Sequence, residues 1–271
     1  MQWRDQAATL RLSRTAAPLC PVLAVASGKG GVGKTFLSVN LALALRDLGF
    51  RCLLVDLDWG LANVDVALGL APQRHIGHVL AGECTLEEIV IDHDGLAVLP
   101  NGCGHAGLAQ VESSRRAALL DSVRALLPRA GLVVADTHPG ISSLTLDVLR
   151  EAQVSVVVST PEPTAMTDTY ALYKVLRSSS RLPARSAGVG AMGLVMNQSR
   201  SHVVADAAAR HLDTVARRFL GHGIDYWGYV LRDDVVPRCV AQQRACLSAA
   251  PRSHPTRAVR ELAKRIAPLL A

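Results

Sequence analysis

The sequence contains no hydrophobic run long enough to cross a membrane. A membrane-spanning helix takes about 18 or more consecutive apolar residues, and no stretch of the 271 residues approaches that length. The first 20 residues also lack a continuous apolar region and carry charged side chains, so no secretory signal is expected there. With 49% hydrophobic and 19% charged residues, we expect a globular protein of the cytoplasm, folded around one large α/β domain.

Paired cysteines are missing as well. The six cysteines include no C-x-x-C pair and no spacing typical of a metal site, so we expect reduced thiols and exclude an iron–sulfur carrier. The net charge of +6 comes from basic residues scattered along the chain. Without a basic cluster, specific DNA binding is disfavoured. The sequence also has no internal repeat and no low-complexity tract.

A phosphate-binding loop is the first feature that points to function. Residues 27–40 are SGKGGVGKTFLSVN, which satisfies the pattern G-x-x-x-x-G-K-[ST] between an apolar run and a helical pattern. We expect Lys34 to reach the β- and γ-phosphates of a nucleotide and Thr35 to complete the coordination of Mg²⁺. The predicted nucleotide-binding residues are Gly28, Gly30, Gly31, Val32, Gly33, Lys34 and Thr35.

Short apolar runs alternate with helical patterns along the rest of the chain. The runs are almost continuously apolar, which is typical of strands covered by helices on both faces. The predicted fold is therefore α/β, with a mostly parallel, doubly wound sheet and helices on both sides. The expected strands are residues 22–26, 52–56, 96–100, 131–136, 154–160, 193–197 and 226–231.

Two of the expected strands end in acidic residues. Asp56 and Asp58 follow one strand and Asp136 ends another, at the carboxyl edge where open α/β sheets bind ligands. We expect Asp136 to hold the hydration shell of Mg²⁺ and Asp58 to extend towards an attacking water. One such acid alone is readily a cap or turn residue. Together with the phosphate-binding loop, the three acids favour a catalytic site.

Lys29 is one lysine more than the phosphate-binding loop needs. With this lysine, the segments KGGVGKT, DLDWGLANVD and ADTHPGIS resemble the deviant Walker A ATPases, the MinD/ParA group of P-loop NTPases. The resemblance implies that ATP closes a homodimer in which Lys29 reaches the partner's nucleotide, as an arginine finger does. It further implies ATP and ADP as the nucleotides, Asn197 as the adenine contact, and Lys29, Lys34 and Asp58 as the catalytic residues.

Within this group, the sequence is most similar to the branch of flagellar number regulators known as FlhG, FleN or YlxH. The resemblance extends from Gly28 to about Ile266. It is carried by LANVDVALGL at 61–70, PEPTAMTDTYALYKVL at 161–176, MNQS at 196–199 and AQQR at 241–244.

The N-terminus adds an independent match to the same branch. Asp5, Gln6, Leu10 and Arg11 fit the D-Q-A-x-x-L-R element with which many members stimulate a partner GTPase, FlhF. We therefore expect residues 1–20 to be a partner-activating extension and 21–271 to be the ATPase domain. Without the resemblance, the same segment is a short amphipathic helix that docks on a partner, or a tail that frays or packs on its own domain.

The two expected switch regions depart from the family pattern. His138 and Pro139 stand where the family usually has two small residues, and Trp59 replaces a more common aliphatic residue. Pro139 has no backbone N–H, which excludes a backbone contact from that residue to the γ-phosphate.

The C-terminal helical pattern has two interpretations. Its apolar stripe consists of Val259, Leu262, Ile266 and Leu269 or Leu270, mainly flanked by basic residues. The segment is either an interfacial membrane helix or the last core helix of the domain, and we favour the core helix because the domain otherwise lacks its closing helix. The sequence leaves recruitment to the cell pole or inner membrane open.

Three functions follow from these observations. The first is a dimerising ATPase that controls flagellar number and placement, with an FlhF-type GTPase, flagellar switch-ring proteins and a flagellar transcription activator as partners. The second is an ATP-gated antiactivator of the transcription regulator that hardly hydrolyses ATP. The third is a division-site or partition ATPase of the same fold, which the D-Q-A-x-x-L-R element disfavours.

Overall fold

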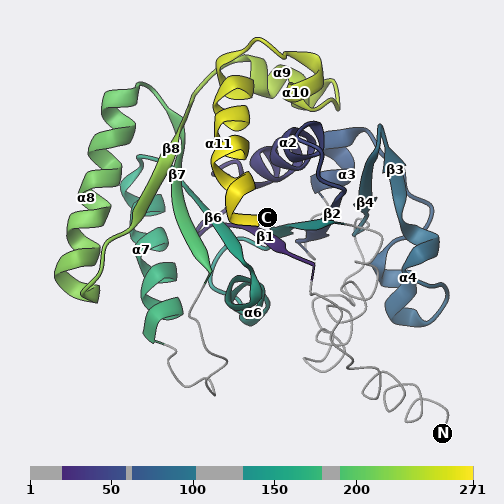
Figure 1. Cartoon of the computed structure of the whole chain (residues 1–271), viewed down its shortest axis with the longest axis horizontal. Coiled ribbons are helices and arrows are strands. Elements are labelled where there is room, and N and C mark those ends of the chain that lie inside the picture. The colour runs from purple at the N-terminus through teal and green to yellow at the C-terminus, as the bar shows by residue number, and fades with distance from the viewer. Residues whose placement is uncertain (1–19, 59–62, 102–130, 179–189, 271) are drawn as a thin grey trace, which may run out of the picture.

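The computed structural model describes residues 20–58, 63–101, 131–178 and 190–270, and these residues form a layered α/β fold (Figure 1). The strands are β1 (Val22–Ala26), β2 (Cys52–Leu57), β3 (Ile91–His93), β4 (Leu96–Leu99), β5 (Leu132–Thr137), β6 (Val154–Ser159), β7 (Ala191–Ser199) and β8 (Asp225–Leu231). The α-helices are α2 (Lys34–Asp47), α3 (Asn63–Leu68), α4 (Ile76–Ala81), α6 (Ser143–Glu151), α7 (Pro163–Ser178), α8 (His202–Leu220), α9 (Val235–Ala241), α10 (Cys246–Ala249) and α11 (His254–Leu270), with a 3-10 turn, η1, at Glu87–Ile89.

The described strands join in one eight-stranded sheet of order β3-β4-β2-β5-β1-β6-β7-β8. Every neighbouring pair is parallel except β3 and β4. All seven predicted strands are present, and the mostly parallel, doubly wound fold is confirmed. Strand β3 was not predicted, because it has three residues and a polar sequence, IDH.

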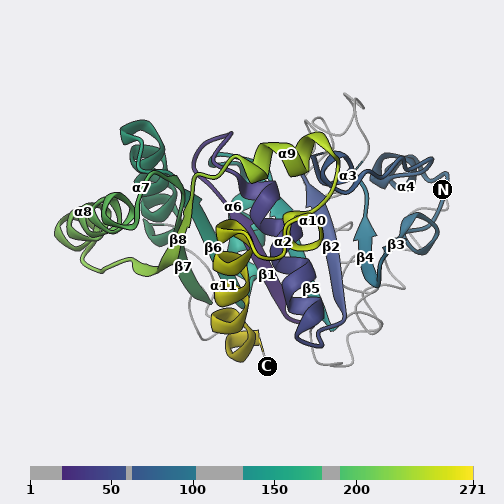
Figure 2. The same cartoon turned by 90° about the horizontal axis from the view of Figure 1, so that it is seen from above.

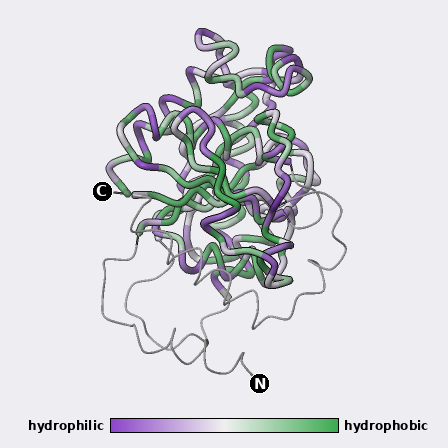
Figure 3. Tube along the Cα trace, turned by 90° about the vertical axis from the view of Figure 1, so that its right-hand side faces the viewer, coloured by the Kyte–Doolittle hydropathy of each residue, from purple (hydrophilic) through white to green (hydrophobic). Residues whose placement is uncertain are grey.

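Alternate residues of the central strands face two separate hydrophobic cores, because successive side chains of a strand point to opposite faces. Val134 packs with α2 and α11 on one face, and Val133 packs with residues of α6, α7 and α8 on the other. The hydropathy of the chain follows this arrangement, with hydrophobic strands in the middle of the molecule (Figure 3). This double coverage explains why β2, β5 and β6 are buried along their whole length.

The topology brings the predicted site residues to one edge of the sheet. Strands β1, β2 and β5 are parallel neighbours, so their carboxyl ends meet where β1 enters the phosphate-binding loop. The register pairs Asp56 directly with Asp136. The predicted N-terminal element, including Asp5, Gln6, Leu10 and Arg11, lies outside the described residues, as does Trp59.

Helix α11 is a core helix, as favoured from the sequence. It lies beside α2 in two perpendicular views (Figures 1 and 2) and packs against α2 and β8. Its buried stripe includes Val259, Leu262, Ile266 and Leu270, whereas Leu269 is 44% exposed. Among the described helices, none is both long and apolar enough to cross a bilayer.

The packing of α11 predicts different effects for two neighbouring substitutions. Ile266→Ala should lower the free energy of unfolding by about 2–5 kcal/mol, because it leaves a cavity at a fully buried position. Leu269→Ala is the matched control and should change it by no more than about 0.5 kcal/mol, since its side chain is largely in water. Urea denaturation measures both values. Equal effects would contradict the burial of only one side of α11.

Candidate active site

The phosphate-binding loop connects β1 to α2, and its surroundings require glycine. Gly31 and Gly33 have φ of 78° and 90°, a backbone conformation that favours glycine. A Cβ atom at Gly33 would overlap the side-chain amide of Asn197, and one at Gly28 would overlap the backbone of Asp168 in α7. The glycines thus let the loop backbone pack closely between neighbouring segments. Their lack of side chains also leaves the backbone open to the close approach of phosphate groups.

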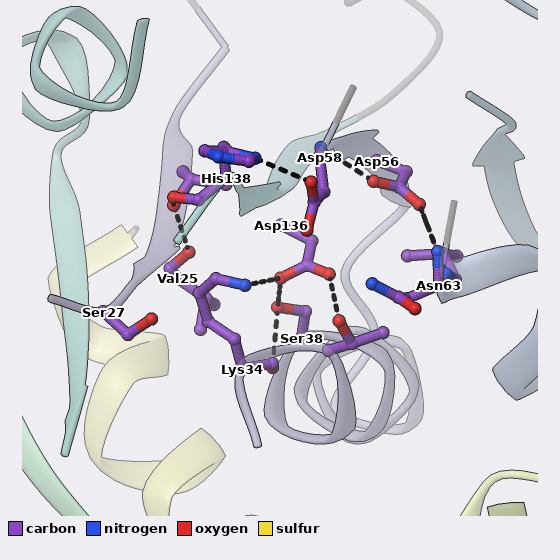
Figure 4. A network of polar contacts seen from close by, with 12 residues as sticks. Val25, Ser27, Lys34, Ser38, Asp56, Asp58, Asn63, Asp136 and His138 are labelled. Atoms are coloured by element: carbon purple, nitrogen blue, oxygen red, sulfur yellow. Dashed lines mark hydrogen bonds and ion pairs between the residues drawn. The ribbon is translucent and has the colours of Figure 1, made fainter. Parts of the chain in front are cut away.

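Asp136 lies at the centre of the polar network that faces this loop (Figure 4). Thr35 donates its hydroxyl to Asp136 Oδ2 at 2.7 Å, and Ser38 donates to Asp136 Oδ1 at 2.9 Å. The Lys34 Nζ atom lies 4.0 Å from Asp136 Oδ1, and both side chains are almost fully buried. One carboxylate thus ties the end of β5 to the first turns of α2.

A second carboxylate, Asp56, lies beside Asp136 in the interior and caps a helix. Asp56 Oδ2 accepts the backbone N–H groups of Asn63 and Val64 at the start of α3, and Oδ1 accepts the N–H of Asp58. Burial and the nearby Asp136 raise the pKa of Asp56 well above its usual value.

The pKa of Asp136 is also raised, because burial outweighs the lowering effect of Lys34, Thr35 and Ser38. Both carboxyl groups are fully buried. Burial therefore disfavours two ionised carboxylates beside the buried Lys34, and a cation bound there would favour their ionised forms.

The oxygen atoms around Asp136 suit Mg²⁺. Hydroxyl and carboxylate oxygens are the hard donors that this ion prefers, and Mg²⁺ usually keeps several waters and takes other ligands from substrate phosphates. The described residues contain no group of three or more histidine, cysteine or acidic side chains that could hold a metal ion. Thr35 and Asp136 are the residues that would hold the ion, next to the phosphate-binding loop.

Lys29 points away from this network. Its Nζ donates to Thr164 Oγ1 at 2.8 Å and lies 3.5 Å from Glu162 Oε2, both at the start of α7. The side chain is 39% exposed, against 8% for Lys34. The two lysines of one loop therefore lie in different surroundings: Lys34 is buried beside Asp136, and Lys29 lies at the surface.

Asp58 follows β2 and is held by three neighbours. Its N–H donates to Asp56, its carbonyl accepts from Asn101 Nδ2 at 2.6 Å, and its Oδ1 atom lies 2.7 Å from His138 Nδ1. Figure 4 places its side chain between His138 and Asp56, next to Asp136. The acid is thus fixed at the edge of the site, and its assignment to water orientation stays a prediction.

Asn197 and Gln198 brace the phosphate-binding loop from β7. Asn197 donates its amide to the Val32 carbonyl at 2.7 Å, and Gln198 donates to the Gly31 carbonyl at 2.9 Å. Asn197 is 4% exposed. The assignment of Asn197 to adenine stays a prediction, and its position against the loop is an additional structural role.

Sequence reasoning missed several members of the network. Ser38 follows Lys34 by one helical turn, so it was predictable from helical spacing. Asn101, His138 and Thr164 reach the site through long-range packing. Thr164 belongs to the matched segment 161–176, but neither it nor Asn101 was assigned to the site. Gly30 lies near the Pro139 ring, so the unusual His138-Pro139 segment lies against the phosphate-binding loop.

Comparison with known proteins agrees with this geometry. Residues 20–182 match the sequence model of a family described as an AAA domain. The chain is 36% identical over 246 residues to the antiactivator FleN of Pseudomonas aeruginosa, a match that covers 90% of this chain and 85% of that protein. The chain belongs to the MinD/ParA family of ATPases. Its α/β domain is therefore a nucleotide-binding ATPase domain of the MinD type.

One further relative and one solved structure are also similar to this chain. It is 36% identical over 154 residues to the flagellum site-determining protein YlxH of Helicobacter pylori, covering 56% of this chain and 52% of that protein. The fold matches the septum site-determining protein MinD from Pyrococcus horikoshii, solved with Mg-ADP, with a TM-score of 0.75 at 22% identity, over 93% of this chain and 98% of that chain.

The buried carboxyl group of Asp136 predicts a pH-dependent stability. A raised pKa in the folded state means that the unfolded chain loses the proton first, so the fold is destabilised as pH rises above the ordinary value of 3.8. Without nucleotide, the Tm of Asp136→Asn relative to wild type should therefore increase as pH rises from the ordinary pKa of 3.8 through the raised pKa of the folded state. With Mg-ATP the order should reverse, since saturation at 100 times Kd stabilises wild type by about 2.7 kcal/mol.

Thermal unfolding followed by fluorescence, with and without Mg-ATP, measures both effects. Asp92→Asn, on the exposed face of β3, is the control that should leave the response to Mg-ATP unchanged. An equal Mg-ATP shift in Asp136→Asn and wild type would reject Asp136 as a magnesium residue.

Proposed function

We propose that this chain is an ATP-dependent dimerising ATPase that regulates flagellar number and placement. The observation that supports it best is the divergence of the two lysines in the phosphate-binding loop. Lys34 lies beside buried Asp136, whereas Lys29 rests at the surface on Glu162 and Thr164. A surface ion pair of this kind is worth about 0–1 kcal/mol. The side chain of Lys29 can therefore give up its contacts with Glu162 and Thr164 at little cost in free energy. It then reaches the nucleotide bound to a second copy of the chain.

Each residue of the site then has a defined part in ATP hydrolysis. Lys34 and the loop N–H groups bind the phosphates. Thr35 and Asp136 would hold Mg²⁺, which would supply positive charge to the transferred phosphoryl group. Asp58 orients the attacking water. Lys29 of the second copy stabilises the charge that develops in the transition state, and hydrolysis thereby depends on dimerisation.

The flagellar role rests on the similarity to FleN and YlxH. We propose that 21–271 form the ATPase domain and that residues 1–20 form an extension that stimulates an FlhF-type GTPase through Asp5, Gln6, Leu10 and Arg11. Flagellar switch-ring proteins and a transcription activator are further proposed partners. ATP binding would set the dimer state, and hydrolysis would end it.

A second candidate is an antiactivator with little ATP turnover. Two observations favour it: the relative from Pseudomonas aeruginosa is named an antiactivator, and Pro139 has no N–H for the γ-phosphate. A division-site ATPase is a third candidate, supported by 29% identity to MinD of Bacillus subtilis over 250 residues. Measured ATP turnover, alone and with an FlhF-type GTPase, distinguishes the first two candidates.

The divergence of the lysines predicts separate defects. Lys34→Ala should abolish ATP binding, because it removes the buried cation beside the phosphates. Lys29→Ala should bind ATP as a monomer but lose dimerisation and about 10³-fold in hydrolysis, by analogy with finger residues. Asp58→Ala should bind ATP and remain dimeric without hydrolysis. Light scattering with ADP, ATP and a non-hydrolysable analogue measures mass, and one constant mass would reject the dimer.

Mixed dimers test whether Lys29 acts on the partner's nucleotide. A chain carrying both Lys29→Ala and Asp58→Ala is paired with wild type and the mixed dimer is isolated. If Lys29 acts in the partner's site, the wild-type site lacks its lysine and the other site lacks Asp58, so the dimer is inactive. If Lys29 acts in its own site, the wild-type site is complete, and substantial activity would refute the proposal.

The N-terminal extension predicts an effect on the partner GTPase. The full chain should accelerate GTP hydrolysis by an FlhF-type GTPase, because a short helix can supply a water-positioning side chain. Gln6→Ala and Arg11→Ala should lose this acceleration and keep the chain's own ATP turnover. Arg14→Ala, outside the matched element, is the control. Unchanged acceleration with both variants would contradict the assignment.

A further inference from the structure

His138 lies beside Asp58 because of the register between two strands. Leu57 in β2 pairs with Thr137 in β5, so the next residue of each strand extends to the same place beyond the sheet edge. There, His138 Nδ1 lies 2.7 Å from Asp58 Oδ1, and the two side chains point towards each other in Figure 4. An ionised carboxylate only accepts hydrogen bonds, so Nδ1 carries the hydrogen.

The segment that carries His138 is tied down on both sides. Thr145 donates its hydroxyl to the His138 carbonyl at 3.1 Å, and Thr137 donates to the Val25 carbonyl at 3.0 Å. Two residues later, the Gly140 N–H donates to the Ser27 carbonyl at 2.8 Å. The backbone of this segment is thus anchored to β1, α6 and the phosphate-binding loop, which limits the positions that the imidazole can take.

The contact with His138 acts on the carboxyl group of Asp58 itself. The hydrogen bond that Asp58 donates to Asp56 and the one that it accepts from Asn101 involve its backbone. The imidazole holds Oδ1 and so restricts rotation about the side-chain bonds. The side chain of Asp58 is 7% exposed, whereas that of His138 is 44% exposed. The carboxyl group therefore lies in the interior, and the imidazole that contacts it lies near the surface.

We propose that His138 is a positioning residue for ATP hydrolysis, acting through Asp58. The inference rests on the proposed function, in which Asp58 orients the attacking water. His138 holds the Asp58 carboxyl group in one orientation by donating from Nδ1, and no covalent bond to either residue forms or breaks. A neutral amide at the place of Nδ1 is sufficient for this role.

Two substitutions distinguish the ring nitrogens. Asn carries its amide nitrogen on Cγ, as His carries Nδ1, whereas the amide nitrogen of Gln is one bond farther out, as Nε2 is. His138→Ala should lower kcat about 10- to 100-fold, the effect of losing an orienting partner, with ATP affinity and dimer mass within twofold of wild type. His138→Asn should recover most of kcat, and His138→Gln should not.

The experiment measures kcat, KM, ATP affinity, dimer mass and Tm on full-length variants. His211→Ala, an exposed histidine on α8, is the control and should match wild type. In the Asp58→Ala background, which should bind ATP and dimerise without hydrolysis, adding His138→Ala should change ATP affinity and dimer mass by less than twofold, because His138 then has no carboxyl group to hold. A large loss of either one there would overturn the proposal.

Other outcomes also decide against it. Recovery by Gln and not by Asn would assign the effect to Nε2, and a loss confined to ATP affinity would assign His138 to binding. A drop in Tm that parallels kcat in all three variants would make it merely structural. If Asp58→Ala is inactive while His138→Ala equals wild type, only this inference fails. If Asp58→Ala keeps full turnover, the proposed role of Asp58 fails as well.

Discussion

The contacts between the buried carboxyl group of Asp136 and the start of α2 are the interaction on which the rest of the site depends. They join β5 to α2 through Thr35, Ser38 and Lys34, and so fix the phosphate-binding loop against the end of the sheet. A second buried acid, Asp56, lies next to Asp136 in register. Burying two acids beside one lysine is unfavourable without further positive charge. The raised pKa values of Asp56 and Asp136 reflect this cost, and in the proposed function a magnesium ion beside Asp136 would offset it.

The same constraint explains the different surroundings of the two lysines. The interior next to Asp136 accommodates one buried lysine, Lys34, whose ammonium group lies 4.0 Å from the carboxyl group of Asp136. Lys29 lies on the other side of the loop, where Thr164 and Glu162 at the start of α7 hold it near the surface. If both lysines pointed into the interior, the loop would have no lysine side chain that could reach a partner chain. In the proposed function, this separation within six residues would link nucleotide binding to association.

Much of the fold and part of the site could be predicted from the sequence, for physical reasons. Continuous apolar runs identify buried parallel strands. An acidic residue at the carboxyl end of such a strand, such as Asp136, is then placed at the edge of the sheet where ligands bind. Short β3 escaped this reasoning because its sequence is polar. The contact between His138 and Asp58 depends on the register of β2 against β5, and that of Lys29 with Thr164 joins residues 135 positions apart. Such contacts follow from packing, which no local pattern specifies.

The unusual His138-Pro139 segment connects the parts of the site. Gly140 donates to the carbonyl of Ser27 at the entry of the phosphate-binding loop, and His138 contacts Asp58. Three consecutive residues thus join the loop to the acid that we assign to water orientation. Proline has a fixed φ, so a displacement at one end of the segment is transmitted rather than absorbed at its centre. In the proposed function, this segment would therefore connect phosphate binding at the loop to the position of Asp58.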